Sequence, residues 1–132
     1  MNRSKRLPIP ENVREQAHKI VADFNEKIIR NPDCFYVLRF TGEYLYLDRP
    51  SPGSAGPIAR LKYQGGMNDW TFAIYKYSSQ RYDSDEWFFP GSEHVDGTVA
   101  GAMKAGLEAY PLPEHTTSIF RRIFSLLPGG KR

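Results

Sequence analysis

The stretch FYVLRFTGEYLYLD, residues 35–48, decides the fold because it has the pattern of a β-hairpin. Apolar and polar side chains alternate on both sides of Thr41-Gly42-Glu43, as they do in strands that bury one face. Gly42 can take the positive φ that a tight turn requires. The alternation predicts that one face of the hairpin enters the core with Leu38, Phe40, Leu45 and Leu47.

Three more strands follow the hairpin. PIARLKY (residues 57–63) and WTFAIYKYS (residues 70–78) alternate in the same way, and a fifth strand is expected to end in EWFFP, residues 86–90. Turn-forming segments, RPSPGSAGP and QGGMND among them, separate these strands. The predicted core face continues with Ala59, Leu61, Trp70, Phe72 and Ile74.

Helices are predicted on both sides of the strands. Residues 10–32 read as an amphipathic helix, with His18 on its exposed flank. Residues 96–111 read as a second helix, with Asp96 as its N-cap and Pro111 at its end. The apolar stripe of the first helix comprises Val13, Ala17, Ile20, Val21, Phe24 and Ile28.

The element order predicts an α+β fold: about five strands in an antiparallel meander, flanked by an N-terminal and a C-terminal helix, plus a short terminal helix. We expect a flexible basic arm at residues 1–9, a single α+β domain at residues 10–112, and a short apolar and basic helix with a tail at residues 113–132. A length of 132 residues is typical of one domain.

Charge and composition limit the functional classes. Of the 18 basic residues, five lie in the two tails, and all 15 acidic residues lie between the tails, so the body carries about −2. A near-neutral body does not favour a nucleic-acid platform. The single cysteine, Cys34, permits no internal disulfide and is expected to be a small buried apolar residue. No apolar run approaches the roughly 20 residues of a membrane span, and we expect a cytoplasmic protein.

A first candidate site is the polar side of the predicted sheet. Aromatic rings can stack on bases and cations can bind phosphates, so this face is a possible ligand or single-stranded nucleic-acid surface. Its residues are Arg39, Tyr44, Tyr46, Arg60, Lys62, Tyr75 and Tyr77.

A second candidate site is an acidic and histidine cluster at residues 83–96. Carboxylates and an imidazole can bind a metal ion or perform acid–base chemistry, but the glycine and distal glutamate of a calcium loop are missing. A strand leaving solvent and entering the core, followed by a turn at Pro90-Gly91, also explains the pattern. The candidate residues are Asp83, Asp85, Glu86, Glu93 and His94.

No catalytic, cofactor-binding or metal-binding residue is assigned, because the nucleophile-elbow, dinucleotide-binding and P-loop patterns are all missing from the sequence. The leading hypothesis is a small non-enzymatic interaction or regulatory module that forms a homodimer or binds a protein partner through residues 97–127. The alternatives are single-stranded nucleic-acid binding on the tyrosine and basic face, and a small hydrolase or metal-dependent enzyme at residues 83–96.

Overall fold

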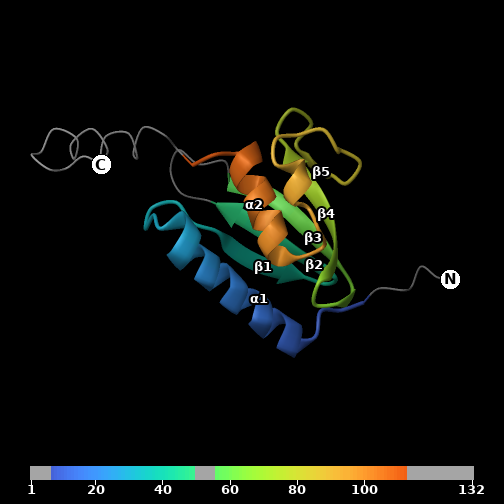
Figure 1. The fold of residues 1–132 in the computed structure, drawn as a ribbon. Helices are drawn as coiled ribbons and strands as arrows, with labels where there is room; N and C mark the ends of the chain where they lie inside the picture. The colour runs from blue at the N-terminus through green and yellow to red at the C-terminus, as the bar shows by residue number, and fades with distance from the viewer. Residues whose placement is uncertain (1–6, 50–55, 113–132) are drawn as a thin grey trace, which may run out of the picture.

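The computed structural model describes residues 7–49 and 56–112, and these form an α+β fold, as predicted (Figure 1). A five-stranded antiparallel sheet is preceded by one helix and followed by another. In chain order the elements are α1 (Glu11–Phe24), a π-helical turn η1 (Asn25–Ile29), β1 (Val37–Thr41), β2 (Tyr44–Arg49), β3 (Gly56–Gly66), β4 (Asp69–Lys76), β5 (Arg81–Asp83), a 3-10 turn η2 (Ser92–His94) and α2 (Val99–Ala109).

The sheet is a meander in which each strand pairs with the next, in the order β1-β2-β3-β4-β5. Gly42 has a φ of 61° in the turn between β1 and β2, which confirms the predicted hairpin. A register shift at Leu47 and Asp48 marks a bulge in the pairing of β2 with β3. The bulge increases local twist and lets two successive residues of β3, Ile58 and Ala59, both be buried.

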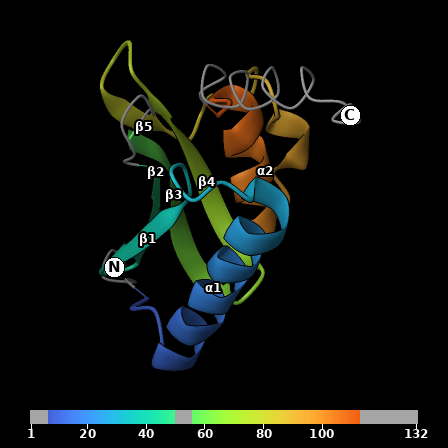
Figure 2. The same cartoon turned by 90° about the vertical axis from the view of Figure 1, so that its left-hand side faces the viewer.

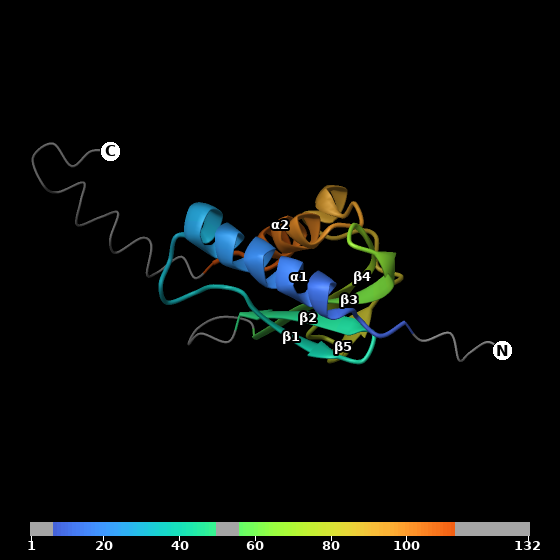
Figure 3. The same ribbon diagram turned by 90° about the horizontal axis from the view of Figure 1, so that it is seen from below.

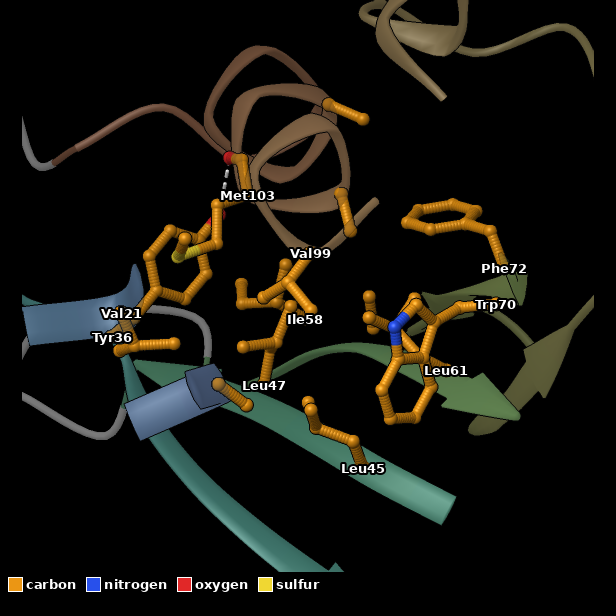
Figure 4. Close-up of a cluster of buried hydrophobic side chains, with 14 of the residues drawn as sticks. Val21, Tyr36, Leu45, Leu47, Ile58, Leu61, Trp70, Phe72, Val99 and Met103 are labelled. Atoms are coloured by element: carbon orange, nitrogen blue, oxygen red, sulfur yellow. Dashed lines mark hydrogen bonds between the residues drawn. The ribbon is translucent and has the colours of Figure 1, made fainter. Parts of the chain in front are cut away.

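Both helices pack on one face of the sheet, and α1 also contacts α2 (Figures 2 and 3). The core lies between these two layers (Figure 4). The predicted core positions of β2, β3 and β4 are confirmed, since all of them are buried, and those of β1 are partly buried against the core. No helix of the described ranges covers the other face of the sheet, which we call the outer face (Figure 3).

The predicted apolar stripe of the first helix is correct as far as Phe24 and wrong at Ile28. The amide of Arg30 donates to the carbonyl of Asn25, five residues back, so the turn contains one extra residue. This extra residue moves the inward position from Ile28, which is 55% exposed, to Ile29, which is buried. His18 is exposed and Cys34 is buried, as predicted.

The predicted fifth strand is too long. Strand β5 ends at Asp83, because pairing with β4 extends only from Lys76–Arg81 to Ile74–Asp83. Residues 84–90 form a loop in which Trp87 and Phe88 are exposed and only Phe89 packs inward, stacking on Phe72. The acidic stretch is therefore not the start of a strand that enters the core.

The second helix begins later than predicted, and Thr98 replaces Asp96 as its N-cap. The Thr98 hydroxyl accepts a hydrogen bond from the Gly101 amide at 2.9 Å, as an N-cap does. Asp96 does not cap the helix directly. Its carboxylate accepts a hydrogen bond from the Thr98 hydroxyl at 2.6 Å and so holds Thr98 in place. The Thr98 amide donates to the same carboxylate at 3.1 Å, and the Thr98 hydroxyl and amide together lower the pKa of Asp96, the hydroxyl being the stronger cause.

Two residues, Tyr36 and Arg49, hold α2 on the sheet. The Tyr36 hydroxyl donates to the carbonyl of Met103 at 2.7 Å inside the core (Figure 4). Arg49, only 1% exposed, donates to the carbonyls of Gly106 and Tyr110 at the C-terminal end of the helix, where a cation is favourable. Burial lowers the pKa of Arg49.

Ile9, which the sequence places in the N-terminal arm, is buried in the core. The predicted terminal helix at residues 113–132 lies outside the described residues. Within the parts of the chain that are described, no helix is long and apolar enough to cross a membrane.

Candidate binding surfaces

The outer face brings together most of the residues predicted for the tyrosine and basic surface. Arg39, Tyr46 and Arg60 are register partners across β1, β2 and β3, and Tyr44 pairs with Lys62. Their side chains share one face because alternate residues of a strand point the same way. The predicted separation of the sheet into an apolar and a polar face is thus confirmed for these positions.

Tyr82, which the sequence pattern did not single out, lies at the centre of this surface. Its ring contacts those of Tyr75, its register partner, at 4.9 Å and Tyr46 at 5.4 Å, measured between centroids. Its neighbour Asp83 is the register partner of Ile74, which faces the core, so Tyr82 faces outward. The signal in the sequence was the alternation of side chains along the fifth strand. Burial is the main cause that raises the pKa of Tyr82.

The arginines of the outer face lie on tyrosine rings. The guanidinium carbon of Arg39 is 4.1 Å from the ring centroid of Tyr46. That of Arg60 is 4.4 Å from Tyr44 and 5.0 Å from Tyr82. Such contacts are favourable and hold the guanidinium groups in fixed places. They also occupy ring surface that a nucleic-acid base would need for stacking.

The charges of this face are unevenly balanced. Arg39 is paired with Asp48 at 2.9 Å, and this ion pair raises the pKa of Arg39 against the opposing effect of burial. Arg60 and Lys62 have no ion pair with any carboxylate of the described residues. The centre of the outer face is therefore cationic.

Tyr77, also predicted for this face, lies at the end of the sheet and links the outer face to α2. Its ring contacts Tyr75 at 4.7 Å and Tyr110 at 5.4 Å, and its hydroxyl donates to the Pro57 carbonyl at 2.6 Å. Partial burial, with smaller effects from neighbouring tyrosines, raises the pKa of Tyr77 to about 12. Tyr77 thus has a structural position at the junction.

The acidic and histidine cluster separates into two groups. In the first, Lys76 bridges Glu86 at 2.9 Å and Asp83 at 3.7 Å, while Asp85 is exposed and donates its amide to the Asp83 carboxylate. The Lys76 hydrogen bond is the largest cause that lowers the pKa of Glu86. A general acid needs a raised pKa, so this environment does not prepare Glu86 for that role.

In the second group, Glu93 and His94 of η2 meet Glu108 of α2, which the sequence did not single out. His94 Nε2 lies 2.9 Å from a Glu108 carboxylate oxygen and 3.8 Å from one of Glu93. One possible ligand atom from each residue lies within 4.8 Å of the others. The donor set suits a transition metal, but both glutamates are exposed, and the contacts also serve as an ordinary link between η2 and α2.

A different surface was not predicted at all: the loop at residues 84–90 presents two large rings to solvent. The exposed fractions are 95% for Phe88 and 60% for Trp87. Beside the rings is a hollow of about 400 Å³, which we call the loop hollow. It is lined by Ile74, Lys76, Tyr77, Ser78, Glu86, Phe88, Phe89, Pro90, Ala109 and Tyr110.

Comparison with protein-family models, curated protein sequences and solved structures finds no match.

Proposed function

We propose that the protein is a non-enzymatic interaction module that self-associates through the loop at residues 84–90. The observation that carries this proposal is the exposure of Phe88, which lines the loop hollow, and of its neighbour in the sequence, Trp87. Exposed apolar surface beside a concavity is typical of interaction sites, and aromatic residues are frequent anchors there.

A second copy of this chain is the occupant that the geometry favours. A projecting ring and a hollow lie next to each other on the same surface, so a twofold rotation can place Phe88 of each copy in the hollow of the other. Among the residues that line the loop hollow, the two charged ones are Lys76 and Glu86, and they pair with each other.

The expected dimer is reversible. Full burial of the four rings of a pair would contribute about 6–12 kcal/mol, at about 1.5–3 kcal/mol each. Loss of rotational and translational freedom costs about 4–15 kcal/mol. Because these terms are similar in size, the dimer should dissociate on dilution.

Several residues of α2, within the predicted partner segment, face their own chain. Ala102, Met103 and Ala105 are buried, and Gly106 lies against Tyr36 and Ile58. Of the predicted partner segment 97–127, residues 113–127 lie outside the described ranges. The proposal therefore places self-association at the loop and the adjoining end of α2.

The test is light scattering after size exclusion over a wide range of protein concentrations. The wild type should change from monomer to dimer, and Phe88→Ser should remain a monomer at concentrations where the wild type is dimeric. Phe35→Ser is the matched control, because Phe35 is 40% exposed but does not line the loop hollow. A wild type that stays monomeric, or a Phe88→Ser variant that still dimerises, would overturn the proposal.

A second candidate function is single-stranded nucleic-acid binding on the outer face. It is supported by the two cations, Arg60 and Lys62, that lack a carboxylate partner among the described residues, and by the absence of a described helix over them. Fluorescence anisotropy with a labelled oligonucleotide at low salt tests it, since electrostatic binding is strongest there. No anisotropy change at low salt would reject this candidate.

A further inference from the structure

The cationic centre of the outer face contains a second concavity, which we call the outer hollow. Ala73 of β4 is the register partner of Arg60, and its methyl group leaves the space between the neighbouring side chains unfilled. The volume is about 260 Å³. Around Ala73 it is lined by Arg60, Lys62, Gln64, Thr71 and Ser84, with Tyr44 at one side.

The polar groups around the outer hollow are hydrogen-bond donors. Arg60 and Lys62 provide a guanidinium and an ammonium, and Thr71 and Ser84 provide hydroxyls. Among the residues that the structure describes, no carboxylate lines the hollow. Two cations and several neutral donors around one concavity suit an oxyanion, because charge-assisted hydrogen bonds are the strong ones.

Two of the donors are already oriented. Arg60 lies against the rings of Tyr44 and Tyr82, so its guanidinium loses little freedom when an anion binds. The Gln64 amide donates to the Thr71 hydroxyl oxygen at 2.8 Å, and this leaves the hydroxyl hydrogen of Thr71 free to donate. The tyrosines thus act as supports for the cations rather than as platforms for bases.

We propose that the outer hollow binds a phosphoryl group through Arg60 and Lys62. The volume lies below the roughly 300–1,000 Å³ of pockets that enclose whole small molecules, so it matches an anionic group rather than a complete nucleotide. The phosphoryl group can belong to a phosphodiester backbone, a phosphomonoester or free phosphate. This proposal rests on the second candidate function, nucleic-acid binding on the outer face. Inorganic phosphate is the probe because its binding can be measured without a nucleic acid, so that either hypothesis can be rejected without the other.

The experiment titrates the full chain with inorganic phosphate at low ionic strength and follows backbone amide shifts by NMR. Saturable shifts should concentrate in β3 and β4 around the outer hollow. Lys62→Gln should raise the dissociation constant at least about tenfold, the effect of one lost charge-assisted hydrogen bond. Lys104→Gln is the matched control, because this exposed lysine of α2 does not line the outer hollow and its loss should change the constant less than about twofold.

A second variant removes the space and keeps the charges. Ala73→Val adds two methyl groups at the floor of the hollow, in a residue type that suits strands. Its amide spectrum shows directly whether the fold is kept, and a folded variant should bind phosphate at least about tenfold more weakly. Absence of saturable shifts up to about 10 mM phosphate would overturn the proposal. So would wild-type affinity in both Lys62→Gln and Ala73→Val, or acetate that competes with equal affinity.

Competition experiments with a single-stranded oligonucleotide identify the source of the phosphoryl group. If a single-stranded oligonucleotide competes with phosphate, and its affinity falls with salt at a slope of about 0.7 per contacted phosphate, the group is a phosphodiester. If phosphate binds and the oligonucleotide does not compete, the site takes a small phosphorylated ligand and the nucleic-acid candidate is rejected. Oligonucleotide binding that is unaffected by both variants would retain that candidate and reject the outer hollow as its site.

Discussion

Replacing Gly106 by alanine should destabilise the protein, although Gly106 lies inside a helix. An added methyl group would lie 2.6 Å from Ile58 Cγ2 and would also collide with the Tyr36 hydroxyl. That hydroxyl donates to the Met103 carbonyl within the core, so it cannot move without leaving buried polar groups unpaired. Gly106 therefore marks a close approach of α2 to core side chains, with no room for an added methyl group.

The magnitude follows from opposing terms. Alanine gains about 1 kcal/mol over glycine in a helix interior. Overpacking costs about 1–3 kcal/mol, and a displaced buried hydroxyl costs about 1–3 kcal/mol more. The net expectation for Gly106→Ala is a loss of about 1–5 kcal/mol in the free energy of unfolding, because the helix gain offsets only part of the cost.

Urea unfolding followed by tryptophan fluorescence measures this change. The control is Gly66→Ala, where φ is not positive and the nearest atom to an added Cβ is 3.5 Å away, so stability should change little. In the background of Tyr36→Phe, which removes the hydroxyl, Gly106→Ala should cost less, and the double-mutant cycle reports that coupling. Equal or higher stability of Gly106→Ala than of the wild type would refute the close approach.

Three further variants test other parts of the fold. Ile29→Ala should lower the free energy of unfolding by about 2–5 kcal/mol in the same assay, because the π-helical turn buries Ile29. Ile28→Ala should lower it by less than about 0.5 kcal/mol, because Ile28 is exposed. Equal effects of the two variants would contradict the π-helical turn. Thr98→Ala should cost about 1 kcal/mol through the lost N-cap, whereas a neutral effect would assign the cap elsewhere. Asp96→Asn should destabilise the protein at neutral pH. Because the pKa of Asp96 is lowered in the folded protein, the difference should begin to shrink only below about pH 4, the ordinary pKa of an aspartate, and should disappear once the pH lies below the lowered pKa. A difference that is unchanged at that acidity would exclude this origin.

The strands β1 to β4 follow from the sequence because alternation and turn residues are local signals. The end of β5 does not, because it depends on how far β4 can pair with it. The aromatic residues Trp87, Phe88 and Phe89 have high strand propensity, but the chain separates from β4 after the pair Ile74–Asp83, although β4 itself extends back to Asp69. The rings that looked like the end of a buried strand therefore became the most exposed ones.

The shift from Ile28 to Ile29 also has a nonlocal cause. The Asn25 side chain exchanges two hydrogen bonds, both 2.9 Å, with the backbone of Tyr36, just before β1. These bonds anchor the π-helical turn to the sheet, and no pattern within the helix reveals them. Arg49 is similar: its position continues the inward side of β2 after Leu47, but a charged residue gave no reason to expect burial.

The outer face was predictable as a set of residues but not as a set of contacts. Period-two alternation gave Arg39, Tyr46 and Arg60 a common side. Only the register shows that Arg60 stands opposite Ala73, which leaves the outer hollow, and only the position of β5 shows that Tyr82 supports Arg60. Hence the sequence indicated a basic aromatic surface, and the structure was needed to argue for an anion rather than for stacked bases.

The two proposed surfaces use opposite sides of one strand and should act independently. Ile74 and Lys76 of β4 line the loop hollow, whereas Thr71 and Ala73 line the outer hollow. Ser84, at the start of the loop, also lines the outer hollow, but Arg60 and Lys62 of the outer hollow are not in the loop. Because successive side chains of a strand point to opposite faces, a dimer formed through Phe88 and the loop hollow leaves these two cations accessible. Phe88→Ser should therefore abolish dimerisation without changing phosphate affinity, and Lys62→Gln should weaken phosphate binding without changing the dimer. If either variant impaired both properties, one continuous interface would have to replace the two surfaces.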